Sequence, residues 1–193
     1  MRGTVDSFPF TRFKSRRRSV YGVEQPSCEV LEQERRLVLE RFDEGVAFEI
    51  GCAIHKRASV EAFEIVVDIR TFDRQLIFAS TAGTSVDNTG WVRRKANAVR
   101  HFLQSSYRLT LEHQSGDRSF AKEWALDVSD YVLAGGGFPV SVKNAGVVGS
   151  ITVSGLEEDL DHAIIVDALC DWLRIPRDEL AFHGQGRRYP MTS

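Results

Sequence analysis

Two short stretches of the sequence carry side chains that can bind an anionic ligand. The first is a loop and helix start with Asn88, Trp91, Arg94 and Lys95, which places two cations close to an aromatic ring. Such a pair can hold an anionic planar molecule through charge and stacking. The competing interpretation is a solvated helix face, and we adopt it for the other arginines of this helix, including Arg100.

The second stretch runs from three consecutive glycines to His162. Gly136, Gly137 and Ser154 carry little side-chain bulk, and we expect a ring of free backbone N–H groups there that can accept a carboxylate, a phosphate or a propionate. Four acidic residues between positions 157 and 161 are expected to raise the pKa of His162. The sequence leaves open whether His162 contacts a ligand or is a capping or interface histidine.

The second stretch is predicted to form a β-hairpin that leads directly into a helix. Phe138–Lys143 and Val147–Ser154 are apolar, with β-branched residues in the second, and Asn144-Ala145-Gly146 suits a tight turn. Ser154 and Glu157 have the spacing of a capping box. The following helix is apolar on almost every side, so it must be buried on two sides, and we expect a second subunit to cover it.

The remaining elements are predicted from hydrophobic spacing and turn residues. Asp68 interrupts an apolar strand, so it is expected on the solvent face or tied to Arg70 or a neighbouring loop. Asp43 is a plausible N-cap of the second helix. The predicted helices are Ser27–Arg41, 46–57 and Trp91–Ser105, and the predicted strands are Phe63–Arg70 and Gln75–Ser80.

Length and composition indicate one domain with an extension at each end. The chain has 193 residues and a formal net charge of −2, so charge alone gives no reason to expect nucleic acid or a membrane surface. No apolar run approaches the roughly 18 residues of a membrane span. Three separated cysteines favour free thiols in a reducing compartment, the cytoplasm, and we expect all three to be buried on helices.

The two ends differ in composition from the middle. Residues 1–26 are rich in arginine, and we interpret them as a flexible extension, with a transit peptide or a weak contact to an anionic surface as alternatives. Residues 27–174 form the predicted domain. Residues 175–193 are predicted to be a mobile tail that lies across another subunit or docks as an extended peptide.

Several motifs together resemble the UPF0303 group, a branch of the superfamily of heme-degrading, heme-binding-protein-like domains. The C-terminal domain of corrinoid adenosyltransferases also belongs to that superfamily. The resemblance covers roughly residues 28–174. It is carried by Phe42-Asp43-Glu44, Val67-Asp68-Ile69-Arg70, Asp87-Asn88, Trp91-Val92-Arg93-Arg94-Lys95, Gly136-Gly137-Phe138-Pro139, the stretch from Gly149 to Leu156, and Asp161-His162.

The resemblance implies an α/β (α+β) fold, an α-β-α sandwich with a central antiparallel sheet of the profilin-like kind. It also implies a homo-oligomer, a dimer or a multiple of dimers, and heme or a related tetrapyrrole near a subunit interface. The pocket would use Asn88, Trp91, Arg94, Lys95, Gly136, Gly137, Ser154 and His162, with no separate metal site. The resemblance implies that His162 is an axial ligand or a hydrogen-bond donor there.

Two other classes of function stay open. An oligomeric adaptor, such as a chaperone or targeting partner, would act through its terminal tails. An enzyme of heme breakdown ranks last, because the sequence contains no Ser-His-Asp set, HExxH motif, P-loop or legible carboxylate pair. We therefore expect a cytoplasmic binding protein, with no nucleic-acid partner and no insertion into a membrane.

Overall fold

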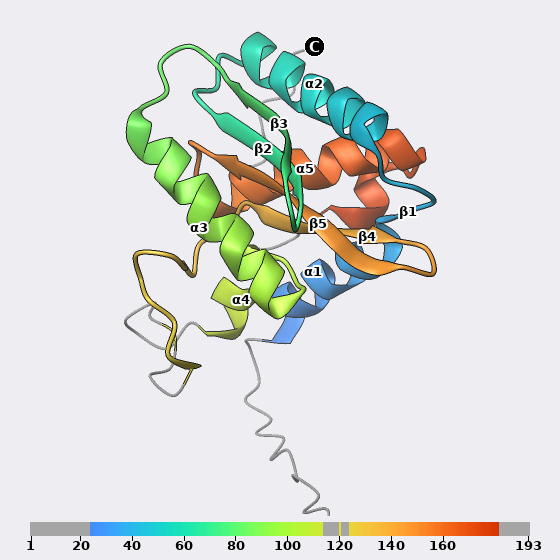
Figure 1. Cartoon of the computed structure of the whole chain (residues 1–193). Helices are drawn as coiled ribbons and strands as arrows, with labels where there is room; N and C mark the ends of the chain where they lie inside the picture. Colours follow the sequence, from blue (N-terminus) through green and yellow to red (C-terminus); the bar gives the residue numbers. More distant parts are fainter. Residues whose placement is uncertain (1–23, 114–119, 121–123, 182–193) are drawn as a thin grey trace, which may run out of the picture.

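Two β-hairpins lie side by side in one five-stranded sheet, and helices cover both of its faces (Figure 1). The computed structural model describes residues 24–113, 120 and 124–181. The first hairpin is β2 (Val66–Thr71) with β3 (Gln75–Ser80), and the second is β4 (Gly137–Val142) with β5 (Gly146–Ser154). The sheet order is β1-β4-β5-β2-β3, so the two hairpins meet where β2 pairs antiparallel with β5.

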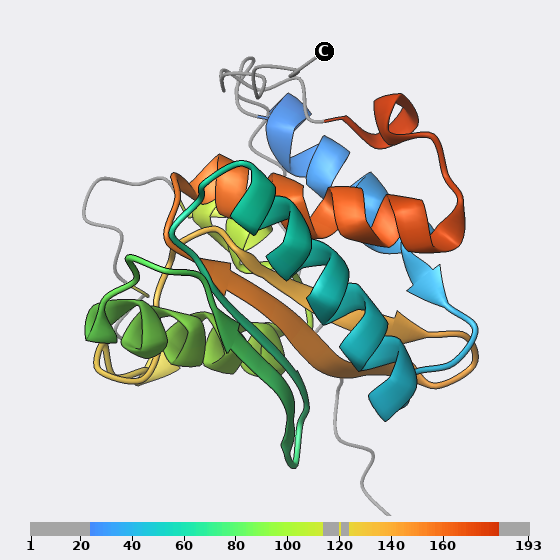
Figure 2. The ribbon, with the colours of Figure 1, turned by 90° about the horizontal axis from the view of Figure 1, so that it is seen from above.

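The helices form a layer on each side of this sheet, as the view from above makes clear (Figure 2). Helix α3 (Val86–Phe102) packs on one face, and α2 (Glu44–Val60) and α5 (Glu158–Leu173) pack on the other. The expected three-layer α/β sandwich is confirmed. The sheet is mixed rather than purely antiparallel, because the short β1 (Val38–Leu39) pairs parallel with β4.

The two faces of the sheet differ in chemistry because side chains alternate along each strand. Ile151 and Val153 of β5 belong to the main apolar core with residues of α2 and α5. Ser150, Thr152 and Ser154 alternate with them and lie on the α3 side, where all three are buried. Helix α3 therefore packs on a face of the sheet that carries many polar groups.

Local sequence signals place both turns and one helix start correctly. Asn144 and Gly146 have positive φ angles of 62° and 78° in the β4–β5 turn, a conformation that Asn and Gly tolerate. The Asp43 carboxylate accepts a hydrogen bond from the Val46 N–H at 2.9 Å and caps α2, as predicted. The predicted β2–β3 hairpin is also confirmed.

Helix α5 is covered by its own chain, which corrects the expectation that a second subunit must cover it. It contacts β4 and β5 on one side, and also α2, the short α4 (Ser106–Glu112) and the 3₁₀ turn η2 (Arg177–Leu180). The capping box is also wrong: α5 begins at Glu158, and its N-cap, Glu157, makes no side-chain capping bond.

The start of the predicted tail is docked on the domain. Leu180 is buried, its carbonyl accepts a hydrogen bond from Gln33 Nε2 at 2.8 Å, and Glu179 pairs with Arg36 at 2.6 Å. Gln33 and Arg36 lie on α1 (Glu24–Arg36), which is shorter at its C-terminal end than the predicted helix and is followed by β1. The predictions for residues 1–23 and 182–193 concern segments outside the described residues.

Two of the three cysteines are exposed, which corrects the prediction that all are buried. Cys28 and Cys52 are exposed, whereas Cys170 is buried on α5 and burial raises its pKa to about 11. Within the described residues, no helix is long and apolar enough to cross a membrane.

Replacing Leu180 by alanine should lower the free energy of unfolding by about 2–3 kcal/mol, because the side chain fills a buried position. Urea unfolding followed by circular dichroism measures this loss. Asp178→Ala, at an exposed position of the same turn, is the control and should change stability by less than about 0.5 kcal/mol. Equal losses for both variants would argue against a docked turn.

Candidate functional site

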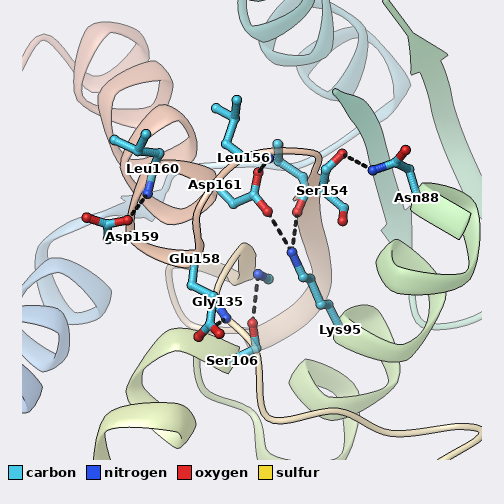
Figure 3. A network of polar contacts seen from close by, with 12 residues as sticks. Asn88, Lys95, Ser106, Gly135, Ser154, Leu156, Glu158, Asp159, Leu160 and Asp161 are labelled. Atoms are coloured by element: carbon cyan, nitrogen blue, oxygen red, sulfur yellow. Dashed lines mark hydrogen bonds and ion pairs between the residues drawn. The ribbon is translucent and has the colours of Figure 1, made fainter. Parts of the chain in front are cut away.

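The junction of β4, β5, α3 and α5 brings together most of the residues that the sequence singled out. Its centre is a buried ion pair between Lys95 of α3 and Asp161 of α5, with Nζ and Oδ2 2.8 Å apart (Figure 3). Lys95 also donates to the Val153 carbonyl of β5 at 3.0 Å, and Asp161 Oδ1 accepts from the Leu156 N–H at 3.0 Å. The pair therefore links two helices to the last strand.

Burial decides what this pair can do. The Lys95 and Asp161 side chains are only 3% and 2% exposed. Burial raises the Asp161 pKa to about 6, although Lys95 and the backbone N–H donors oppose the shift. The Lys95 charge is already matched by a carboxylate and a carbonyl, so it is not available to a ligand, which corrects its predicted role.

The three glycines 135–137, at the start of β4, serve close packing, and two of their N–H groups have partners within the described residues, which corrects the expected ring of free N–H groups. The Gly137 N–H donates to Ser106 Oγ at 2.8 Å, and the Gly135 N–H reaches the Glu158 carboxylate at 3.3 Å. Gly136 has φ +105°, and a Cβ there would lie 2.5 Å from the Val153 carbonyl oxygen. These positions are glycine because four elements meet there.

His162 is enclosed in the core beside this junction. Its ring is 1% exposed, and Nε2 lies 2.7 Å from Gln33 Oε1. The rings of Tyr107 and Phe138 lie against it, with centroids 5.0 and 5.7 Å away. Burial lowers the His162 pKa to about 3, the opposite of the predicted shift, because no charged group in the described structure compensates for desolvation.

Asn88 and Ser154 belong to the support of α3. Asn88 Oδ1 accepts from the Ser85 backbone N–H at 2.9 Å, which completes the N-terminal cap of the helix. Its Nδ2 lies 3.5 Å from the Ser154 carbonyl, so the cap is also linked to the end of β5 (Figure 3). The N-cap itself is Ser85, and Asn88 is the third residue of α3, which begins at Val86, earlier than the predicted start at Trp91.

Trp91 and Arg94 are the predicted site residues that reach solvent. The Arg94 guanidinium carbon lies 4.1 Å from the centroid of the Trp91 ring, in cation–π geometry. Trp91 is 37% exposed, and Arg94 Nε makes one long contact, 3.4 Å, to the Gly90 carbonyl. The structure thus divides the predicted site into a buried junction and an exposed pair on α3.

Sequence reasoning missed Asp161 as the partner of Lys95. A usable signal is present, because Lys95 lies at helical spacing from Val92 and Val99, on the apolar stripe of its helix, and a buried lysine requires an opposite charge. The partner lies 66 positions away, so only the fold identifies it. No cluster of three or more metal-ligating side chains occurs in the part of the chain that the structure describes.

Lys95→Met should lower the free energy of unfolding by about 3–5 kcal/mol, because it leaves the Asp161 carboxylate buried without its cation. Adding Asp161→Asn should restore at least about 2 kcal/mol of that loss, since an amide keeps the acceptor for Leu156 and carries no charge. Denaturant unfolding of both single variants and the double variant measures the coupling. Strictly additive losses would contradict a direct interaction.

His162 should make the protein less stable in mild acid. Its pKa is lowered in the folded state, so below the ordinary value of 6.5 the unfolded chain binds a proton that the folded chain refuses until about pH 3. Stability should fall by up to about 1.4 kcal/mol per pH unit from this group as pH drops from about 6.5. Urea midpoints from about pH 7 to 4.5 should show a shallower slope in His162→Gln. Parallel slopes would contradict the assignment.

Comparison with known protein sequences identifies the family of this chain. A family model described as "Haem degrading protein HbpS-like" matches residues 42–170. A UPF0303 protein of Mesorhizobium japonicum is 55% identical over 148 residues, 77% of this chain and 89% of that protein. A UPF0303 protein of Brucella anthropi is 46% identical over 149 residues, 77% of this chain and 88% of that protein.

Solved structures share the fold at low sequence identity. The Ybr137w protein superposes with a TM-score of 0.71 and 23% identity, over 82% of this chain and 91% of that chain. A structure titled as a PduOC:Heme complex gives a TM-score of 0.55 at 19% identity, over 69% and 94% of the two chains. HbpS gives 0.56 at 18%, over 69% and 90%.

The family model covers well over half of the chain, and the curated relatives align along most of their own length. The three similar solved structures support the fold only. The chain therefore belongs to the HbpS-like haem-degrading protein family and, within it, to the UPF0303 group.

Proposed function

We propose that the protein binds an anionic planar ligand of the tetrapyrrole class on the outer surface of α3. The observation that carries the proposal is the stacked pair of Trp91 and Arg94, 4.1 Å apart and partly open to solvent. A tetrapyrrole such as heme has a flat macrocycle and carboxylate side chains. The indole offers a surface for stacking, and the guanidinium can pair with a carboxylate.

Membership of the HbpS-like family supports a heme-related ligand for this surface. One structure with the same fold is titled as a heme complex, which gives that ligand class a precedent on the fold. Bound heme would supply an iron centre. We propose binding of the ligand and no reaction on it.

His162 does not fit as an axial ligand in this structure. Its ring is enclosed by Tyr107 and Phe138, and Nε2 is taken by Gln33. The other ring nitrogen, Nδ1, is buried and has no partner within the described residues. Gln33 lies on α1, Tyr107 on α4 and Phe138 on β4. A ligand could reach the His162 ring on α5 only if these three elements separated.

The support for the surface comes from the buried junction. Lys95 follows Arg94 directly and anchors α3 to Asp161 and Val153 from the inner side of the helix. Asn88 caps the first turn, one turn before Trp91. Lys95, Asn88 and the glycines are thus positioning residues, and Trp91 and Arg94 are the contact residues.

A homo-oligomer, a dimer or a multiple of dimers, is part of the same proposal. Phe48 of α2 is 58% exposed on one side of the sheet, and Phe78 of the edge strand β3 is 45% exposed. Ile77 faces α2, so Phe78, the next residue along the strand, lies on the opposite face. Each is a large exposed apolar side chain of the kind that an interface between subunits can bury. The cytoplasm remains the compartment we propose.

Hemin added to the purified protein should produce a saturable shift of the Soret band. Trp91→Ala and Arg94→Ala should each weaken binding by roughly tenfold, equivalent to about 1.4 kcal/mol, because each removes half of the stacked pair. Absorbance titration measures the affinity, and light scattering in the same samples gives the mass of the assembly.

The matched control is Arg93→Ala. It removes the same charge from the adjacent position, but Arg93 is paired with Asp130 at 2.7 Å and lies outside the stack. Arg93→Ala and a folded His162→Gln should bind hemin like wild type. Loss of binding in His162→Gln alone, with Trp91→Ala and Arg94→Ala unaffected, would overturn the proposed surface.

A further inference from the structure

A cavity of about 230 Å³ lies between the β2–β3 hairpin and α3, and neither the predicted site nor the proposed tetrapyrrole surface includes it. Its wall carries three arginines and one carboxylate: Arg70, Arg74 and Arg100 with Asp73. Asn97, Gln75 and Ser150 add polar groups, and the small Ala96 leaves room on the helix side. A cavity with this lining favours an anion.

The three guanidinium groups are not fully used by the protein. Arg70 donates through Nε and Nη2 to the buried Asp68, at 2.5 and 2.6 Å, and its Nη1 has no hydrogen bond to another described residue. Arg74 pairs with Glu44. The Arg100 side chain forms no ion pair and no hydrogen bond within the described part of the chain.

The one acidic side chain in the wall is already engaged. The Asp73 carboxylate accepts a hydrogen bond from the Thr71 hydroxyl at the hairpin turn, and this bond lowers the pKa of Asp73. Asp68 is also committed, since it accepts from both Arg70 and Gln75. Donors therefore remain on Arg70 and Arg100, and Arg74 keeps nitrogens beyond the Nη2 that pairs with Glu44.

A buried hydroxyl adds a second, independent observation. Ser150 of β5 lies directly opposite Arg70 of β2 in the sheet, and it is 1% exposed. Its Oγ is buried without a hydrogen-bond partner in the described structure. Buried hydroxyl groups normally have partners, so an unpaired one in the wall of a basic cavity indicates a ligand oxygen.

We propose that this cavity binds a small oxyanion, a phosphate group or a carboxylate, held by Arg70, Arg100 and Ser150. The planar guanidinium group matches the geometry of both anions. The volume is below the about 300–1,000 Å³ of pockets for drug-sized ligands, so the ligand is small. An adjoining cavity of about 500 Å³ shares Asn97 and Arg100 and gives the ligand a route from solvent.

Isothermal titration calorimetry with inorganic phosphate and, separately, succinate tests the proposal on the full-length protein. Wild type should bind at least one of them saturably, with a dissociation constant below about 10 mM that rises with added salt. The anion that binds more tightly identifies the ligand class.

Arg100→Gln should weaken binding at least about tenfold, since it removes the unpaired cation. Ser150→Ala should weaken it about fivefold without adding bulk to the core.

Arg35→Gln is the control, because Arg35 is an exposed arginine on α1, a helix that does not line the cavity. It should bind the anion like wild type, and all variants should show the wild-type circular dichroism spectrum. Arg100→Gln should also keep hemin binding, which separates this site from the proposed tetrapyrrole surface. No saturable binding of either anion, or equal affinity in Arg100→Gln and Arg35→Gln, would overturn the proposal.

Discussion

The buried ion pair of Lys95 and Asp161 is the constraint on which the arrangement of the other elements depends. Two charges removed from water must satisfy each other, and here the backbone of β5 and of the loop after it supplies the remaining partners. The pair sets the distance of α3 from α5 across the end of the sheet. The glycines before β4 follow from it, because a Cβ on Gly136 would lie 2.8 Å from the lysine nitrogen.

This constraint separates support from recognition. The polar groups between the helices and β5 bond to one another, so they are not available to a ligand. What α3 offers to other molecules is its outer side, with the Trp91 and Arg94 stack near one end and Arg100 near the other. The two proposed anion surfaces therefore lie on one helix, and both depend on the same internal anchor.

Local patterns in the sequence were sufficient for most of the fold. Asn144 and Gly146 fix a turn, Asp43 caps α2, and Asp68 with Arg70 forms the expected pair, because each signal acts within a few residues. The short β1 was missed, since a two-residue parallel strand has no periodicity of its own. The docked turn at Leu180 was missed because its partner, Gln33, lies 147 positions away.

The candidate site was predicted less well than the fold. Residue types identified the right neighbourhood, but they did not distinguish the inner from the outer side of α3, so Lys95 and Arg94 received the same role. The pKa of His162 was predicted from the acidic residues beside it in the sequence, whereas its neighbours in space are aromatic rings. Arg100 is exposed, as predicted, but its place in one cavity wall with Arg70 and Ser150 could not be predicted, because β2 and β5 become neighbours only when the two hairpins pair.

The polar face of the sheet beneath α3 limits how this helix can change. Apolar layers tolerate small sliding movements, because dispersion contacts have little directionality. Hydrogen bonds and ion pairs do not, since their strength depends on angle and distance. Helix α3 is held by Lys95 at its middle and Asn88 at its start, so it cannot rotate or advance by a residue without losing both. The positions of Arg94 and Arg100 on the outer side of α3 are therefore held as rigidly as the strands beneath the helix.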